Sequence, residues 1–340
     1  MNILLHTEVL NERGTTVAIR DYAQVLSRLG LQVSIAYSSI NTSNVNSVVD
    51  QIRSEFELYD YSDFQIFARQ NSKKWDVAYF IKYGYFDGKI VPNIPNIVHA
   101  VFQSYDPHGE IYLYVSEWLS RKMRIENFKN LAKLSPKGFD SFKPQKFRHL
   151  SHIVALPFSE RKMRSDWGIP ADGIIGGRHG AADTFDVRFV QDLIGSLLTE
   201  NKKLYFVFAN TNRFIEHPRV IFLPTLTSRR QTREYLASLD FYLHARHRGE
   251  TFGLALLEAM LCKIPVFSYS KGVDGNHRYL LRMSQDSLFE SPEQLRQQIS
   301  KFREYRDVEY NFLIANRFSQ DSIMHDWQSL LNELGKSPAV

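Results

Sequence analysis

The first 38 residues alternate between strand-like and helix-like patterns, and this alternation restricts the chain to folds built on a parallel sheet. Residues 2–7 (NILLHT) form a short apolar run that is typical of a buried strand. From Thr15 to Leu29 apolar side chains recur at helical spacing, and Gly30 stops that helix before the strand pattern of residues 31–38 (LQVSIAYS). A strand, a helix and a strand in so few residues predict a βαβ unit with a right-handed crossover.

The same alternation continues along the chain and restarts after a break at residues 157–173 (PFSERKMRSDWGIPADG). This stretch combines prolines, glycines and charges between apolar runs, as interdomain linkers do. Because 340 residues exceed what one hydrophobic core usually serves, we predict two domains. The expected class is α/β, with Rossmann-like, doubly wound domains over residues 1–157 and 158–318 and a C-terminal helix within residues 319–340. Strands are expected at 76–82, 96–102, 111–116, 173–177, 203–210, 219–223, 240–245 and 264–269, and further helices at 184–199, 229–238, 253–262, after Ser291 and at 321–334.

The composition is that of an ordinary globular protein, with 44% apolar and 23% charged residues. No apolar run is long enough to span a bilayer, and the start of the chain does not resemble a signal peptide. Cys262 is the only cysteine, which excludes an internal disulfide framework and a zinc site built on paired cysteines. We therefore expect a cytoplasmic protein.

Basic residues outnumber acidic ones by only 42 to 37, and both signs are interspersed along most of the chain. This pattern favours an ordinary solvated surface, and we expect no nucleic-acid partner. One local cluster of Arg161, Lys162 and Arg164 lies beside Trp167. It predicts either weak peripheral contact with the acidic headgroups of a membrane or a polar interdomain linker, and we favour the linker.

Residues 240–272 carry the pattern of a strand, a polar loop and a helix that starts close to Gly253. Ligands of open α/β sheets bind outside the carboxyl ends of the strands, where this loop must lie. A helix start offers unpaired backbone N–H groups and the positive end of the helix dipole, and both favour a phosphate. We expect the N–H groups of Phe252, Gly253 and Leu254 to form such a site, in which Gly253 allows the phosphate to approach closely.

Glu258 is unusual because it lies in an apolar stripe of this helix, among Leu254, Ala255, Leu261 and Cys262. Burying a carboxylate there is costly unless a polar group meets it. A pair of ribose hydroxyls would suit an ionised carboxylate, which accepts two hydrogen bonds. A structural arginine or lysine from elsewhere in the chain would suit it equally well.

Glu250 and Glu258 have seven residues between them, with Phe252 and Gly253 in the gap, and AMLCKIPVFSYSKG follows at 259–272. This arrangement resembles the Glu-x7-Glu motif and the AMA-G-PV segment of glycosyltransferase family 4. The stretch VSEWLS at 115–120 is similar to the end of the family's first domain.

The resemblance implies a GT-B fold, in which two Rossmann-like domains face each other across a cleft and the terminal helix crosses back to the first domain. It also implies a nucleoside-diphosphate sugar donor and transfer with retained anomeric configuration. Glu250 would contact the donor sugar, Glu258 the ribose, and Thr251 would lie in the same donor loop.

The clamp for the donor diphosphate departs from the family pattern, which has an arginine and a lysine after the first strand of the second domain. Here the stretch is IIGGRHGAADTFD at 174–186, where Arg178 fits the first position and no lysine follows. Arg246 or Arg248 would supply the missing charge, unless they are surface residues. His244 ends the preceding strand, either near the substrates or as a buried core histidine. An uncompensated clamp would favour an inactive protein or an unusual donor.

The first domain is expected to supply the acceptor side. Gly14 and Thr15 resemble the family's glycine loop near the donor phosphates, although ordinary helix starts use the same residues. His99, in the strand NIVHAVF, either faces the transferred sugar or is a core histidine. Three residues at strand ends are candidates for lining the acceptor pocket, with a structural role favoured for each: His108, Lys82 and Asp87.

No Asp-x-Asp pair occurs in the chain, so we predict that no metal ion or other cofactor is required. Positive groups and the helix dipole would then stabilise the departing nucleoside diphosphate. The predicted activity is that of a retaining hexosyltransferase, acting from a nucleotide sugar onto a hydroxyl of a glycan, lipid-linked or other acceptor. The alternatives are a nucleotide-sugar epimerase of the same architecture and a non-catalytic nucleotide-sugar-binding relative.

Overall fold

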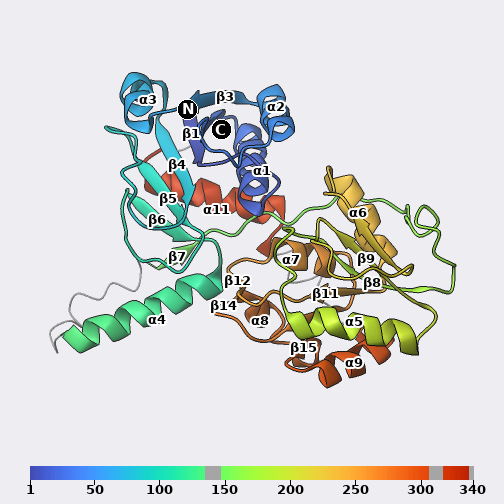
Figure 1. Cartoon of the computed structure of the whole chain (residues 1–340). Helices are drawn as coiled ribbons and strands as arrows, with labels where there is room; N and C mark the ends of the chain where they lie inside the picture. The colour runs from blue at the N-terminus through green and yellow to red at the C-terminus, as the bar shows by residue number, and fades with distance from the viewer. Residues whose placement is uncertain (135–146, 306–316, 337–340) are drawn as a thin grey trace. The chain divides into compact units, whose positions relative to one another are not determined.

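The computed structural model describes residues 1–134, 147–305 and 317–336 of the chain (Figure 1). The chain forms two compact units. The first comprises Met1–Ile153 and Gln320–Val340, and the second comprises Val154–Ser319. Each unit has its own parallel sheet, which confirms the predicted α/β class with two Rossmann-like sheets.

The first unit is built on a seven-stranded sheet in the order β3-β2-β1-β4-β5-β6-β7. Its central strand β1 pairs in parallel with β2 on one side and with β4 on the other, so that Leu5 lies opposite both Ile35 and Tyr79. The strands are β1 (Asn2–Thr7), β2 (Gln32–Ser38), β3 (Glu57–Tyr61), β4 (Val77–Lys82), β5 (Asn96–Ala100), β6 (Ile111–Tyr114) and β7 (Arg148–His149). The helices are α1 (Gly14–Arg28), α2 (Asn46–Glu55), α3 (Phe64–Asn71), α4 (Glu117–Leu134) and α11 (Gln320–Glu333).

The C-terminal helix α11 packs on the first unit beside α1, as the sequence predicts (Figure 1). Its Trp327 is fully buried, with ring centroids 5.4 Å from Tyr22 of α1 and 5.1 Å from Tyr79 of β4. Burying an indole of this size between a helix and the sheet contributes several kcal/mol. Helix α11 therefore contributes to the hydrophobic core of the first unit.

The second unit is built on a six-stranded parallel sheet in the order β10-β9-β8-β11-β13-β15, with a short β12-β14 pair beside it. The strands are β8 (Ile174–Arg178), β9 (Leu204–Ala209), β10 (Val220–Leu223), β11 (Phe241–His244), β12 (Gly249–Glu250), β13 (Val266–Tyr269), β14 (Asp274–Gly275) and β15 (Leu288–Phe289). The helices are α5 (Arg188–Glu200), α6 (Arg229–Ser238), α7 (Leu254–Leu261), α8 (Asn276–Leu280) and α9 (Pro292–Ser300).

The strand order of the second sheet reverses between β8 and β11. From β8 the chain moves outward through β9 and β10, and it then returns to place β11 on the other side of β8. Such a reversal opens a crevice at the carboxyl ends of the two strands, because their connections leave in opposite directions. Arg178 and His244 end these two strands, so the fold brings the predicted donor residues to this edge.

Candidate functional site

Glu250 lies in β12, on the loop between β11 and α7, and its carboxylate is held by two basic side chains. Arg246 donates a hydrogen bond of 2.8 Å to Oε2, and His244 Nε2 lies 3.3 Å from Oε1. Burial alone would raise the pKa of Glu250, but the hydrogen bond and charge of His244 and the charge of Arg246 lower this pKa to about 2. Glu250 is therefore a carboxylate at neutral pH, and its side chain remains 20% exposed.

Hydrogen bonds to two residues of α8 fix the loop that carries Glu250. The Glu250 backbone N–H points at His277 Nδ1, 3.3 Å away, and Asn276 donates a hydrogen bond of 2.5 Å to the Phe252 carbonyl. Burial is the main reason that the pKa of His277 is lowered to about 3, so its ring is neutral and Nδ1 can accept. The loop conformation is thus set by residues that the sequence patterns did not single out.

Gly253 is the residue that caps the start of α7. Its φ of 88° lies in the left-handed region, which side chains other than glycine rarely adopt. Leu254 begins the helix, and Phe252, before the cap, is buried with its ring at 5.7 Å from that of Phe318. The first N–H groups of a helix have no partner within the helix, so this turn presents donors and a positive dipole end beside Glu250.

Glu258 is buried on α7, as its apolar neighbours predict, and its partner is His179. The carboxylate Oε2 accepts a hydrogen bond of 2.7 Å from His179 Nε2. The two side chains are 12% and 11% exposed, respectively. The partner is neither an arginine nor a lysine, and it leaves the second carboxylate oxygen, Oε1, without a hydrogen bond from the side chains described.

His179 follows Arg178 at the carboxyl end of β8, so the sequence offered one signal for it: a polar residue at the strand end where ligands bind. Its backbone carbonyl accepts a hydrogen bond of 2.7 Å from the Tyr242 hydroxyl. Within the described part of the chain, its Nδ1 is buried without a hydrogen-bond partner. The side chain is therefore fixed at one nitrogen and unsatisfied at the other.

Arg178 is a buried cation that has only neutral partners in the described residues. Its guanidinium donates to the hydroxyls of Thr184 (3.0 Å) and Thr211 (3.2 Å) and to the backbone carbonyls of His179 and Ala181. Only 5% of the residue is exposed. A buried charge normally has an opposite charge beside it, because its loss of hydration is otherwise not compensated. The guanidinium is therefore suited to an anionic ligand.

The Tyr242 hydroxyl lies near the charged side chains of Arg178, Glu250 and Glu258. Burial is the main reason that the pKa of its hydroxyl is raised; the charges of Glu258 and Glu250 add to this effect and that of Arg178 opposes it. One phenol in β11 is thus within electrostatic reach of all three predicted charged residues. The structure brings Arg178, Glu250 and Glu258 together at the carboxyl edge of the second sheet.

The two arginines of the loop between β11 and α7, Arg246 and Arg248, bind carboxylates of the protein. Arg246 binds Glu250, as described above. Arg248 donates a hydrogen bond of 2.6 Å to Asp274, whose side chain is only 2% exposed. Both arginines therefore neutralise acidic groups of the protein, and Arg178 is left as the candidate for the diphosphate.

The predicted residues of the first unit have different surroundings. His99 is 0% exposed, its Nδ1 lies 2.5 Å from the Tyr79 hydroxyl, and burial lowers its pKa to about 3. This is the environment of a core histidine. Gly14 and Thr15 form the first turn of α1, where Gly14 is exposed and no side chain caps the helix.

Lys82 and Asp87 form an ion pair with a distance of 2.6 Å, and Lys82 also donates to the Lys89 carbonyl at 3.0 Å. The Lys82 side chain is 3% exposed, so this pair anchors the loop after β4. His108 lies on the next loop, where its Nδ1 is 2.6 Å from the Asp106 carbonyl. These two loops lie at the carboxyl edge of the first sheet.

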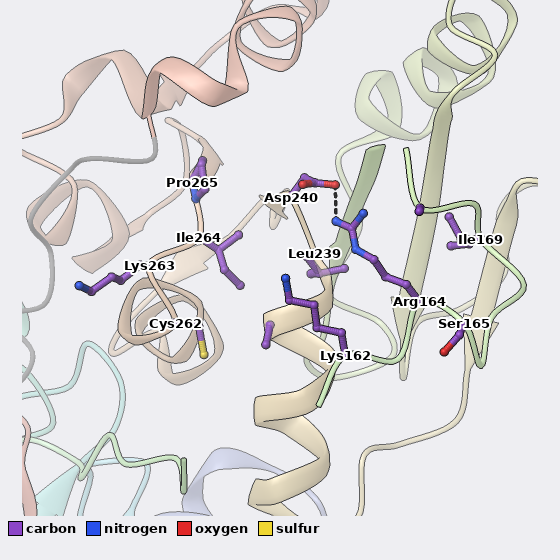
Figure 2. Close-up of a pocket in the computed structure, with 12 residues that line it drawn as sticks. Lys162, Arg164, Ser165, Ile169, Leu239, Asp240, Cys262, Lys263, Ile264 and Pro265 are labelled. Atoms are coloured by element: carbon purple, nitrogen blue, oxygen red, sulfur yellow. Dashed lines mark hydrogen bonds and ion pairs between the residues drawn. The ribbon is translucent and has the colours of Figure 1, made fainter. Parts of the chain in front are cut away.

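A cavity of about 810 Å³ lies at the opposite, amino edge of the second sheet (Figure 2). It is lined by residues that precede β11 and β13, including Asp240, Cys262 and Ile264, and the Arg164–Asp240 ion pair of 2.6 Å forms part of its lining. None of the predicted donor residues lines it. Because ligands of doubly wound sheets bind at the carboxyl edge, we do not assign the donor to this cavity.

Two arginines of the predicted linker form ion pairs within the second unit. Arg161 forms ion pairs with Asp166 and Glu234, and Arg164 pairs with Asp240. Among the residues described, no group of acidic, histidine or cysteine side chains is arranged to hold a metal ion. In the same part of the chain, no helix has both the length and the apolar character that crossing a bilayer requires.

Comparisons with known proteins agree with this geometry. Residues 214–310, which contain β11, Glu250 and α7, match the family described as "Glycosyl transferases group 1". Comparison with curated proteins gives no match. Among solved structures, a glycosyltransferase from Rickettsia africae superposes with a TM-score of 0.69 at 12% identity, covering 98% of each chain.

Two further structures are similar over nearly the whole length. Anabaena HepE, solved in complex with UDP-glucose, has a TM-score of 0.71 at 11% identity, over 98% of this chain and 100% of that chain. TarM of S. aureus has a TM-score of 0.64 at 9% identity, over 97% and 99%. The chain thus has the two-sheet GT-B fold of glycosyltransferases, as predicted. The family match is confined to residues 214–310, the segment that holds Glu250 and Glu258.

Proposed function

We propose that the protein transfers a hexose from a nucleoside-diphosphate sugar to a hydroxyl acceptor, with retention of configuration and without a divalent metal. The second unit would bind the donor and the first unit the acceptor. UDP-glucose is the first donor to test, because HepE was solved in complex with it. A cytoplasmic location and a weak membrane contact stay predictions.

The buried guanidinium of Arg178 is the observation that carries the proposal. It lies at the switch point of the sheet, next to His179, which binds Glu258 of α7, and it has no carboxylate partner among the described residues. A diphosphate supplies the missing negative charge, and bidentate guanidinium–phosphate pairs are among the stronger hydrogen-bonded contacts. The same contact stabilises the negative charge that develops on the diphosphate as the bond to the sugar breaks.

The two glutamates would divide the rest of the donor between them. Glu258 has one carboxylate oxygen on His179 and the other available for a ribose hydroxyl. Glu250 is ionised and lies on the loop before the helix, where it would contact the transferring sugar and favour the positive charge that develops at the anomeric carbon. The acceptor hydroxyl would attack from the face that the diphosphate leaves, and a departing phosphate oxygen would take its proton.

The experiment is a donor-consumption assay with UDP-glucose and a panel of other nucleotide sugars, in excess chelator and in magnesium. We expect similar rates in both conditions, since no metal site is needed to hold the diphosphate. A rate that vanishes in chelator and returns with manganese would refute metal independence. Absence of both turnover and nucleotide binding for every donor would refute the proposed activity.

A non-catalytic nucleotide-sugar-binding protein is the second candidate. It is favoured by the engagement of Arg246 and Arg248 with carboxylates, which leaves the diphosphate clamp with Arg178 alone. Tight UDP binding without consumption of any donor, in the presence of varied hydroxyl acceptors, would distinguish this candidate from the enzyme.

A further inference from the structure

One loop at the carboxyl edge of the first sheet carries three large exposed aromatic side chains. Tyr83, Tyr85 and Phe86, here called the aromatic platform, are 46%, 53% and 51% exposed. The Tyr83 ring lies 5.1 Å from that of Tyr85 and 4.7 Å from that of Phe102 on the neighbouring loop. Single exposed apolar residues are common on protein surfaces, but grouped aromatic rings at a ligand-binding edge indicate a contact surface.

The platform is held rigidly although its rings are exposed. The Phe86 N–H donates a hydrogen bond of 2.7 Å to Asp106, and the Gly84 carbonyl accepts one from the Tyr112 hydroxyl. Gly84 itself has a φ of 127°, and a Cβ atom there would lie 2.9 Å from the Ala100 Cβ. Only glycine therefore fits between the two tyrosines of the platform.

The Lys82–Asp87 pair fixes the other end of the same loop, since Asp87 accepts from both Lys82 (2.6 Å) and the Lys89 N–H (3.1 Å). A loop with this many anchors loses little conformational entropy on binding a ligand. Aromatic rings that are presented in this way provide a large contact area at low entropic cost.

His108 adds a polar group of defined character beside the platform. Its ring lies 5.1 Å from that of Phe86, and its Nδ1 must donate to the Asp106 carbonyl because a carbonyl only accepts. Burial, as the largest cause, lowers the pKa of His108, so the ring is neutral and Nε2 carries a lone pair. Among the described residues, Nε2 has no hydrogen-bond partner.

We infer that the aromatic platform is the binding surface for a saccharide acceptor, whose C–H faces stack on Tyr83, Tyr85 and Phe86. This inference rests on the proposed function for its role in catalysis. The positively polarised C–H groups of a sugar ring complement the negative face of an aromatic ring. The buried Nε2 of His108 lies in the ring beside Phe86, and it takes a hydrogen-bond donor, such as a sugar hydroxyl, and not an anion.

The chemistry of the neighbouring loop separates a saccharide from a membrane surface. Residues 102–110 (FQSYDPHGE) contain two acidic side chains and no lysine or arginine. An anionic bilayer would gain no electrostatic attraction from residues 102–110.

The test is saturation-transfer NMR on the full chain with neutral tetrasaccharides built from glucose, galactose, mannose or N-acetylglucosamine. We expect transfer to the sugar C–H protons of at least one probe. Tyr85→Ser should weaken that binding by about tenfold, and Tyr85→Phe should preserve it because the ring remains. Phe158→Ser, which removes an 80% exposed aromatic ring from the second unit, is the matched control and should leave binding unchanged.

A UDP titration on the same samples reads the donor site separately. UDP binding without binding of any saccharide overturns the platform alone. Saccharide binding without UDP binding or donor consumption overturns the proposed function and leaves the platform standing. Saccharide binding that Tyr85→Ser and a Tyr83→Ser/Tyr85→Ser double variant both retain overturns the inference, as does binding to neutral phosphatidylcholine vesicles in place of the sugars.

Discussion

Replacing Arg178 with methionine should separate ligand binding from folding. The guanidinium is buried against neutral partners, so its removal loses hydrogen bonds but also relieves the cost of burying a charge. Thr184 and Thr211 keep other acceptors, the carbonyls of Ala181 (2.8 Å) and Ala209 (3.1 Å). We therefore expect the free energy of unfolding to change by no more than about 1 kcal/mol.

The affinity for UDP should respond far more strongly to the same change. Charge-assisted hydrogen bonds to a phosphate contribute about 1.5–3 kcal/mol each, and the guanidinium can make two of them. A loss of about 2–4 kcal/mol corresponds to UDP binding that is roughly 30- to 1,000-fold weaker. Isothermal titration calorimetry with UDP, and urea denaturation of the same samples, measure the two quantities.

Arg248→Met is the matched control, because it removes the same kind of side chain from another loop, between β11 and α7, at the same edge of the sheet. This change removes the ion pair between Arg248 and the buried Asp274 carboxylate, so it should destabilise the fold by about 2–4 kcal/mol. UDP affinity of the folded fraction should stay near that of the wild type. If Arg178→Met instead destabilises the protein while UDP binding is unaffected, Arg178 is a structural cation and the assignment of the donor diphosphate to it is refuted.

Three further predictions concern the neighbouring groups. Glu250→Gln should lower turnover by about a hundredfold or more with little change in UDP affinity, and Glu258→Gln should do the reverse; equal losses of UDP affinity would contradict the division of roles. His179→Phe should weaken UDP binding by about three- to tenfold, because Glu258 loses the hydrogen bond that orients it, whereas unchanged binding in calorimetry would mean that the pair is only structural. Burial lowers the pKa values of His6 and His99 to about 3, against 6.5 for the unfolded side chain. Between these two pH values the unfolded state therefore binds more protons than the native state. The free energy of unfolding should therefore fall as the pH is lowered from about 6.5 toward 3, by about 1.4 kcal/mol per pH unit for each histidine. Urea titrations at several pH values should show a smaller slope for His99→Gln. An unchanged slope would mean that the His99 ring is already protonated in the fold.

The sequence predicted the elements whose local signals agree with their packing. Helix α9 begins where expected, since the Ser291 side chain accepts from the Gln294 N–H and Pro292 occupies the first turn. The segment from α2 to α3 was not predicted, because its signals are weak. Helix α2 buries only Val49 and Ile52, and β3 is an edge strand whose exposure does not alternate cleanly. Neither the helical period nor the strand period is strong there.

The site was predicted as far as residue type and spacing determine it. A carboxylate in the apolar stripe of α7 required a polar partner, and the structure provides one. Its identity as His179 depends on the approach of β8 to α7, which lies 79 residues away in the sequence. The complete burial of His99 could not be predicted from the sequence either, because an apolar strand pattern does not show which strands flank the strand that carries His99. In the structure β4 and β6 do so, opposite Ile81 and Leu113.

The charges at the carboxyl edge of the second sheet also indicate what kind of ligand completes it. Glu250 has Arg246 beside it and Glu258 has His179, so each carboxylate already has a basic neighbour. In the described residues, Arg178 has no such counterpart. A ligand that adds one strongly anionic group beside Arg178 and neutral hydroxyls beside the two glutamates satisfies all three at once. A nucleoside diphosphate sugar has this distribution of charge. A neutral sugar without a phosphate group would leave the buried guanidinium without an anion.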